Sequence, residues 1–322
     1  RTSDDSSDAD GDGDDDDDAA DWRAAYERRC AAETARDRRL PPSVHDIEAD
    51  SPDFHHYEAD YGPIYQRHLR QHELKYRARP YMPEPQHDLK ASYRTILVDW
   101  IVEVCEEYRL SWTTLFLVVE LIDRSLSRFR VQHPRLQLLG CACILLAAKY
   151  EEIYTPSVND LVYISDNTYA REDMLAMERR VAAALGFRLT CVTPASFAAR
   201  FCAAARSMPR EASLVRYLLA LALQDYGLVG QLASVKAAAA LHLARQTLPD
   251  ATRPIWDAQI AHYTGYAPGD AALQRCVRRM HALHLAAEEA PQKAVRAKFN
   301  TPENHRVTCV TCLLPEQLSF DP

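Results

Sequence analysis

LQLLGCACILLAAK, residues 136–149, is apolar on almost every side. A helix of this kind is stable in water only where other helices surround it. Its small residues Gly140, Cys141, Ala142 and Cys143 would allow those neighbours to approach closely. The stretch therefore predicts the central helix of a helical bundle.

The same pattern returns further along the chain. The segment LGCACILLAAK (139–149) aligns with VKAAAALHLAR (235–245) at an offset of 96 residues, and each segment ends in a cation. A repeat of this length indicates two similar helical domains in tandem, each of roughly 95 residues. No segment keeps a period-two alternation for long, so we predict an all-α fold. In the first domain, helices are expected at residues 113–129, 133–154, 155–169 and 171–189.

The chain before the first domain changes character twice. Eleven of residues 1–21 are Asp, and such a low-complexity acidic segment should be disordered. Residues 57–77 carry aromatic and apolar groups at helical spacing, which predicts a short amphipathic helix. We divide the chain into a disordered tail (1–53), an N-terminal helix with a proline-rich connector (54–90), a first domain (91–190), a second domain (191–290) and a C-terminal tail that packs on both domains (291–322).

Charge and composition exclude several classes of protein. The net charge is −8, but residues 1–21 contribute −10, so the rest of the chain carries about +2. A near-neutral folded part gives no strong field for nucleic acid, and we expect no nucleic-acid partner. No run of 18 apolar residues is present, so no membrane association is expected. The nine cysteines follow no secreted spacing, which suits a reducing compartment.

Motifs for catalysis are missing or weak. No GxGxxG, P-loop, HExxH or GxSxG occurs. His305, Cys309 and Cys312 form a single H-x3-C-x2-C, and one CxxC without a second pair is weak evidence for zinc. Glu151 and Glu152 are adjacent, so a helix would point them about 100° apart and make them a poor catalytic pair. We therefore expect no enzyme, no cofactor and no metal site.

The segment KASYRTILVDWIVEVCEEYRL, residues 90–110, opens the first domain. Its apolar residues Ile96, Leu97, Trp100, Ile101 and Val104 recur at the spacing of one helix face. We expect Ile101 and Val104 to fill the core. Charged side chains are interleaved with this face, so periodicity alone leaves open what the rest of it contacts.

At YRTILVDWIVEV, LAAKYEEIYTP and the tandem repeat, the sequence resembles a mitotic-type cyclin over residues 55–320. The resemblance implies two five-helix cyclin boxes in tandem. The segments EVCEEYRL, LVYISDNTY and APQKAVRAKF…LLPEQL are more similar to A-type than to B-type cyclins.

The resemblance also implies roles for single residues. Arg94 is expected to pair with Asp123 inside the first box, as a structural ion pair. A patch that docks Arg-x-Leu peptides is expected from Tyr93, Ile96, Leu97, Trp100, Glu103, Leu136 and Gln137, with Glu103 accepting the peptide's cation. Tyr93 and Thr95 depart from the Met and Ala that the family usually has there. A kinase-binding surface is expected from Lys149, Tyr150, Glu178 and Phe187, with Tyr65, His68 and Leu69 of the N-terminal helix reaching the other kinase lobe.

The function implied is that of a regulatory subunit of a cyclin-dependent protein kinase, which controls cell-cycle progression at S phase or G2-M. Its expected partners are the kinase, substrates and inhibitors with Arg-x-Leu segments, and the ubiquitin-dependent degradation machinery. The nucleus, with exchange with the cytoplasm, is the expected location. Two alternatives stay open at this point: a kinase-independent scaffold that only docks peptides, and a tandem-box transcription factor. The latter would need a zinc ribbon and a basic second box, whereas this N-terminus is rich in Asp.

Overall fold

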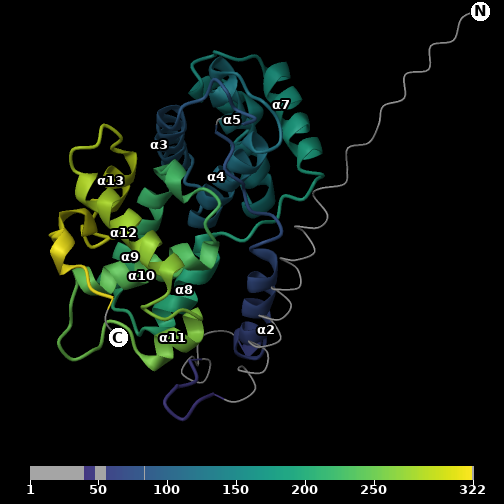
Figure 1. Ribbon diagram of the computed structural model, residues 1–322. Coiled ribbons are helices and arrows are strands. Elements are labelled where there is room, and N and C mark those ends of the chain that lie inside the picture. Colours follow the sequence, from purple (N-terminus) through teal and green to yellow (C-terminus); the bar gives the residue numbers. More distant parts are fainter. Residues whose placement is uncertain (1–39, 48–55, 83, 321–322) are drawn as a thin grey trace, which may run out of the picture.

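The computed structural model describes residues 40–47, 56–82 and 84–320. The expectations for the acidic tail concern residues that lie almost entirely outside these ranges. Within them the chain forms α-helices and short 3-10 turns and no strand, which confirms the predicted all-α fold. The first and second helical domains occupy the upper and lower halves of Figure 1.

The first domain is built around the predicted central helix. Its five helices are α3 (Ala91–Glu107), α4 (Trp112–Leu126), α5 (Leu136–Glu151), α6 (Val158–Ile164) and α7 (Arg171–Ala184). In α5, Leu136 and every residue from Leu138 to Ala148 are buried, because α4 and α7 pack along it. Ser111 begins α4 by accepting a hydrogen bond from the Thr114 amide (3.2 Å), and Ser157 begins α6 with a capping box.

The second domain repeats this plan. Its helices are α8 (Pro194–Ala204), α9 (Pro209–Gln224), α10 (Ala233–Thr247), α11 (Ala258–Thr264) and α12 (Ala271–Ala286). Every residue of α10 except Lys236 is buried, and α8, α9 and α12 pack against it. Its alanines lack bulk, so these three helices can approach closely. Two tandem five-helix domains are therefore confirmed, each with a helix of small residues at its centre.

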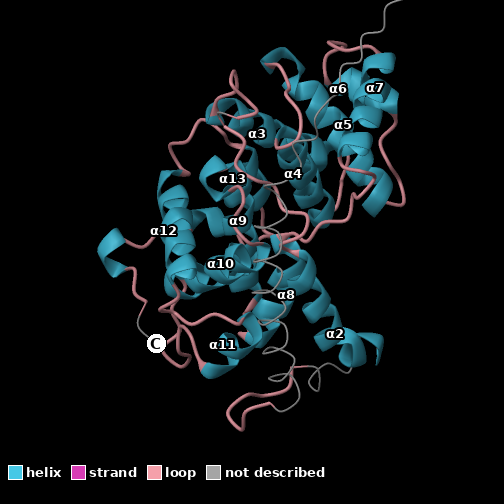
Figure 2. Ribbon diagram, turned by 45° about the vertical axis from the view of Figure 1, so that its right-hand side comes forward, coloured by secondary structure: helices cyan, strands magenta, loops and turns pink. Residues whose placement is uncertain are grey.

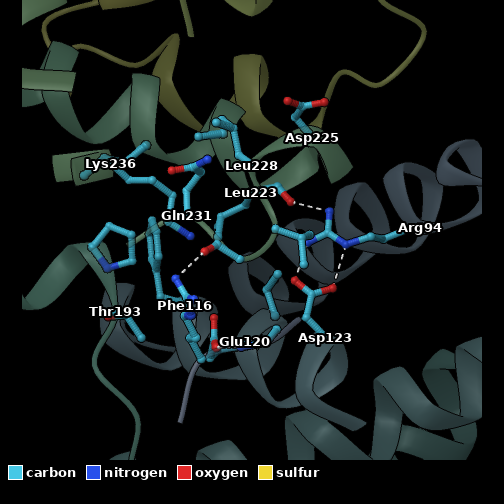
Figure 3. A pocket seen from close by; sticks show the side chains of 18 residues that line it. Arg94, Phe116, Glu120, Asp123, Thr193, Leu223, Asp225, Leu228, Gln231 and Lys236 are labelled. Carbon is cyan, nitrogen blue, oxygen red and sulfur yellow. Dashed lines mark hydrogen bonds and ion pairs between the residues drawn. The ribbon is translucent and has the colours of Figure 1, made fainter. Parts of the chain in front are cut away.

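A buried ion pair joins the two domains (Figure 3). Arg94 of α3 donates from Nε and Nη2 to the two carboxylate oxygens of Asp123 in α4, at 2.7 and 2.6 Å. Its Nη1 donates to the carbonyl of Leu223 at the end of α9, at 2.8 Å. Tyr81, from the proline-rich connector, donates its hydroxyl to the same carboxylate at 2.8 Å. Burial by itself would lower the pKa of Arg94, but Asp123 raises it above its ordinary value, so the guanidinium stays charged.

The end of α9 is held by further groups of α3. The Thr95 hydroxyl donates to the Gln224 carbonyl at 2.9 Å, and the Gln224 side chain donates to Asp99 at 2.8 Å. Asp99 also accepts the amide of Ala294, the first residue of α13 (Ala294–Phe299), at 3.1 Å. A carboxylate at a helix N-terminus is favoured by the helix dipole. The C-terminal tail is thereby attached to both domains.

The N-terminal helix α2 (His56–His72) lies beside the second domain in both Figure 1 and Figure 2, although it precedes the first domain in the chain. Buried Arg70 donates to the Tyr266 hydroxyl (3.1 Å) and to the Thr264 carbonyl. Buried Glu73 accepts the amide of Ser234 (3.0 Å) in the first turn of α10. These contacts satisfy both charged groups and fix the helix on the second domain.

The C-terminal segment, residues 313–320, packs across α10 and α12. Gln246 of α10 accepts the Ser319 amide at 3.2 Å, and Phe320 stacks on His242 at 5.5 Å between ring centroids. His281 of α12 binds the Leu313 carbonyl at 2.8 Å. Burial lowers the pKa of His242 to about 4, and burial together with the charges of His281 and Arg296 lowers that of His284 to about 4. Both rings are therefore neutral at pH 7.

We predict that Arg94→Ala lowers the free energy of unfolding by about 3–5 kcal/mol, because it leaves the Asp123 carboxylate buried without its cation. The matched control is Arg130→Ala, which removes an ion pair with Asp88 whose side chains are both more than half exposed. That change should cost less than about 1 kcal/mol. Urea unfolding of both variants measures the two free energies of unfolding. Equal decreases would show that the buried pair stabilises the protein no more than the exposed one.

We predict that acid destabilises the protein from about pH 6.5 down to about pH 4, before most carboxylates titrate. A histidine with a lowered folded-state pKa binds protons in the unfolded state first, so its contribution is complete above pH 6.5 and is lost on acidification. Each of the two histidines should contribute about 1–3 kcal/mol over this window. His242→Gln should flatten the dependence of the melting temperature on pH, and the exposed His305→Gln should leave it as in the wild type. An unchanged profile for His242→Gln would contradict this assignment.

Candidate interaction surfaces

A shallow apolar seam runs where α3 meets the start of α5. We call it the docking seam, and it comprises Tyr93, Ile96, Leu97, Trp100, Glu103, Leu136 and Gln137. Ile96 is 56% exposed, and Trp100 and Gln137 are partly buried. Leu97 and Leu136 are each only 5% exposed, so the expectation that they form an exposed surface is corrected: they form its floor.

Gly140 explains how Trp100 comes to lie partly open. A β-carbon at Gly140 would stand 3.0 Å from Leu97 Cδ1 and 3.5 Å from Trp100 Cζ3. A side chain at this position would force Leu97 to shift, so glycine favours the close approach of α3 to α5. The indole therefore lies against α5 at Gly140 and stays partly exposed.

The two ends of the docking seam differ in chemistry. Glu103 is exposed one turn beyond Trp100, where its carboxylate can accept hydrogen bonds from a cation. At the opposite end the Tyr93 ring packs on His133, with 4.1 Å between centroids. The arrangement can hold an extended peptide that carries a cation followed by an apolar side chain.

A second surface lies at the other end of α5. We call it the ion-pair face, and it comprises Lys149, Tyr150, Glu178 and Phe187. Lys149 Nζ donates to Glu178 Oε1 at 2.6 Å, with the lysine side chain half exposed. The Tyr150 hydroxyl bonds the Thr190 hydroxyl, which turns its ring across the surface. The Glu178 side chain is only 13% exposed, so the lysine end of this ion pair is the part most accessible to a partner.

Phe187 is presented by an unusual turn. The amide of Phe187 donates to the Ala182 carbonyl (2.8 Å) and that of Gly186 to the Ala183 carbonyl (2.9 Å), a Schellman motif that ends α7. Both residues have positive φ, 59° for Gly186 and 57° for Phe187. A bulky residue rarely adopts this conformation, which costs on the order of 1–3 kcal/mol. In this turn Phe187 is 77% exposed.

The N-terminal helix adds to the ion-pair face only in part. Tyr65 and His68 are exposed on α2. Partial burial and the nearby Glu151 carboxylate raise the pKa of Tyr65, which places its ring close to the end of α5. Leu69 is 5% exposed and packs in the core, so it offers a partner far less surface than Tyr65 or His68. Its neighbour Arg70 turns this side of the helix toward the second domain.

Three exposed apolar residues near the ion-pair face were missed in the sequence. Ile153 and Tyr154 are each 91% exposed, and Ile64 of α2 is also exposed. The sequence predicted a helix through residue 154, whereas α5 ends at Glu151, and Ile153 and Tyr154 follow in a bend of the loop. Pro156 in the segment IYTP indicates an earlier helix end, because the residue just before a proline avoids helical geometry.

The polar groups of the interdomain cavity and the cysteines of the C-terminal tail are engaged in structural contacts. The interdomain cavity in Figure 3 is lined by Arg94, Asp123 and Glu120, and Glu120 accepts the Ala78 amide at 3.0 Å. Cys309 donates to the Asn300 side chain and Cys312 to the His284 carbonyl, both at 3.6 Å. In the described ranges, no group of three or more His, Cys, Asp or Glu is placed to hold a metal ion. No helix in this part of the chain has the length and apolar character needed to span a membrane.

Family models match both halves of the chain. Residues 64–190 match the model "Cyclin, N-terminal domain", and residues 192–313 match "Cyclin, C-terminal domain". The chain belongs to the cyclin family. The boundary between the two matches falls just before α8, so each five-helix domain corresponds to one cyclin domain.

Known cyclins agree with the predicted subtype. This cyclin is 40% identical to Cyclin-A1 of Carassius auratus over 241 residues, which cover 74% of this chain and 60% of the relative. It is 37% identical to the G2/mitotic-specific cyclin-A of Hydra viridissima over 262 residues, covering 80% and 60%. The chain thus spans about 60% of the length of these relatives. A viral cyclin from herpesvirus saimiri shares the fold, with a TM-score of 0.60, 21% identity and coverage of 68% of this chain and 95% of that one.

Proposed function

We propose that this cyclin is the regulatory subunit of a cyclin-dependent serine/threonine kinase and controls cell-cycle progression at S phase or G2-M, with no catalysis of its own. The observation that carries the proposal is the ion-pair face and its surroundings. There, large apolar side chains stand open to solvent near the Lys149–Glu178 ion pair, whose lysine is half exposed: Ile64, Tyr65, Tyr150, Ile153, Tyr154 and Phe187. Exposed aromatic groups around paired charges are typical of a protein interface.

The mechanism follows from what this face can hold. Lys149 has hydrogen-bond donors to spare beyond Glu178, and Glu178 has a free acceptor, so together they can bind the backbone of a helix laid across them. The aromatic groups would pack against that helix's apolar side. Holding a kinase's mobile helix inward allows the kinase to form its own Lys–Glu pair and to open its activation loop. The rigid connection between α2 and the second domain gives the kinase a fixed template.

The docking seam serves a separate purpose in the same proposal. We infer that it binds Arg-x-Leu segments of substrates and inhibitors, with Glu103 taking the cation and Trp100 the apolar residue. Leu136 and Lys149 are thirteen residues apart on α5, which separates the two surfaces by about 20 Å. A peptide and a kinase can therefore be bound together. Nuclear location and ubiquitin-dependent destruction belong to this proposal and rest on the family alone.

We predict that Lys149→Glu weakens kinase binding by about 2–5 kcal/mol, because it places a carboxylate beside Glu178 and removes a donor from a desolvated interface. The fold should be preserved, since the substituted Lys149 side chain is 50% exposed and belongs to no part of the core. The measurement is kinase affinity by calorimetry, with circular dichroism as the check on folding. Arg130→Glu, which breaks a more exposed ion pair elsewhere, is the charge-reversal control and should bind normally. Normal kinase binding and activation by Lys149→Glu would exclude the ion-pair face as the kinase site.

We predict that Trp100→Ala lowers docking affinity by about 2 kcal/mol, a roughly thirtyfold loss, because it removes the aromatic anchor of a shallow site. A substrate with an Arg-x-Leu segment should suffer mainly in KM, since docking away from the reacting hydroxyl is uniform binding. A short substrate without the segment should be phosphorylated as before. The two substrates are compared on wild-type and variant complexes at equal kinase concentration. Equal losses on both would mean that Trp100 supports the fold or the kinase interface instead.

A further inference from the structure

We propose that Tyr93, His133 and Lys90 form a subsite that selects docked peptides with an acidic side chain four or five residues after the arginine. This inference rests on the proposed docking function and names the class of peptide it prefers. It concerns the end of the docking seam farthest from Glu103.

The seam continues past its apolar part by one further pair of residues. Tyr93 lies three residues before Ile96 on α3, and His133 lies three residues before Leu136, in the 3-10 turn that leads into α5. Their rings are 4.1 Å apart at a tilt of 38°, so α3 and α5 stay in contact here through an aromatic pair. His133 is exposed and Tyr93 is partly exposed. Both rings therefore border the path that a peptide would follow along the seam.

This end of the seam is electropositive and rich in donors. Lys90 Nζ is 6.0 Å from the centre of the Tyr93 ring. The Tyr93 hydroxyl, an imidazole N–H of His133 and the Lys90 ammonium can all donate to a carboxylate. The first turn of α3 holds no acidic residue, and Asp88 just before it is paired with Arg130. The seam thus has a negative end at Glu103 and a positive end at Lys90.

The spacing of the two ends fixes the position of the acidic residue. Ten residues of α3 separate Tyr93 from Glu103, a rise of about 15 Å. An extended peptide advances by about 3.3 Å per residue, so it covers this distance in four to five residues. With its arginine on Glu103, the leucine two residues later reaches Trp100 and Leu97. The fourth or fifth residue after the arginine then reaches the donors around Tyr93.

The preference depends on a residue that departs from the family pattern. Where Tyr93 stands, the family usually has Met, which offers neither a hydroxyl nor a ring for His133 to pack on. The acidic preference should therefore be weaker in a Tyr93→Met variant, which keeps the apolar seam intact. This substitution separates the subsite from the docking that it extends.

The test measures the binding of labelled peptides to the full chain by fluorescence anisotropy. The probes share one Arg-x-Leu core and carry Asp, Ala or Lys at the fifth residue after the arginine. We expect the Asp peptide to bind about three to ten times more tightly than the Lys peptide, the range of a partly exposed charge interaction. Tyr93→Met should reduce that ratio, and the double variant Lys90→Glu, His133→Glu should invert it. Arg275→Glu, an exposed charge reversal on the second domain, should leave it unchanged.

The outcomes separate this inference from the docking proposal. Equal binding of the Asp and Lys peptides, or a ratio that survives the double variant, would overturn the subsite while leaving Arg-x-Leu docking in place. Failure of all three peptides to bind the wild-type chain would overturn the docking proposal itself. Melting temperatures of the variants within a few degrees of the wild type show that altered ratios do not come from unfolding.

Discussion

The buried ion pair between Arg94 and Asp123 is the interaction on which the rest of the molecule depends. One guanidinium binds a carboxylate of its own domain and a helix-end carbonyl of the other, and the connector's Tyr81 binds the same carboxylate. The negative end of the α9 dipole meets a fixed positive charge there. Because each polar group of this cluster is satisfied only when all three parts are in place, the angle between the domains is set by hydrogen bonds as well as by apolar packing.

The two candidate surfaces are preformed in this rigid arrangement. The docking seam begins at the first turn of α5 and the ion-pair face at its last, so one buried helix supports both. The side chains that point outward from it are few, while those that point inward are closely packed. A partner that binds either surface meets preformed geometry, and the cost of ordering the site has already been met by folding.

Much of the architecture could be predicted from the sequence, since a helix that is apolar all round admits only a central place. The Arg94–Asp123 pair came from the family resemblance, because no local pattern links residues 29 positions apart. The burial of individual side chains was predicted less well. Leu69 looked like its neighbour Tyr65 on a helical face, and it is the contact of Arg70 with Tyr266, almost two hundred residues away, that decides which of them is buried. The end of α5 likewise depends on a tertiary contact: Glu152 accepts the Ser111 amide at 2.6 Å, which draws the chain out of the helix and exposes Ile153 and Tyr154.

The attachment of α2 to the second domain has a consequence for how the chain is made. Glu73 finds its partner at Ser234, and Arg70 finds its own at Thr264 and Tyr266, so α2 can dock only after most of the second domain has been synthesised. Domains generally fold as units, from the N-terminal end, during translation. Here the first five-helix domain can fold before α2 docks, because about 200 residues of chain separate Arg70 from its partner Tyr266. A chain truncated before Ser234 would therefore leave the charged side chains of Arg70 and Glu73 without these partners in the second domain.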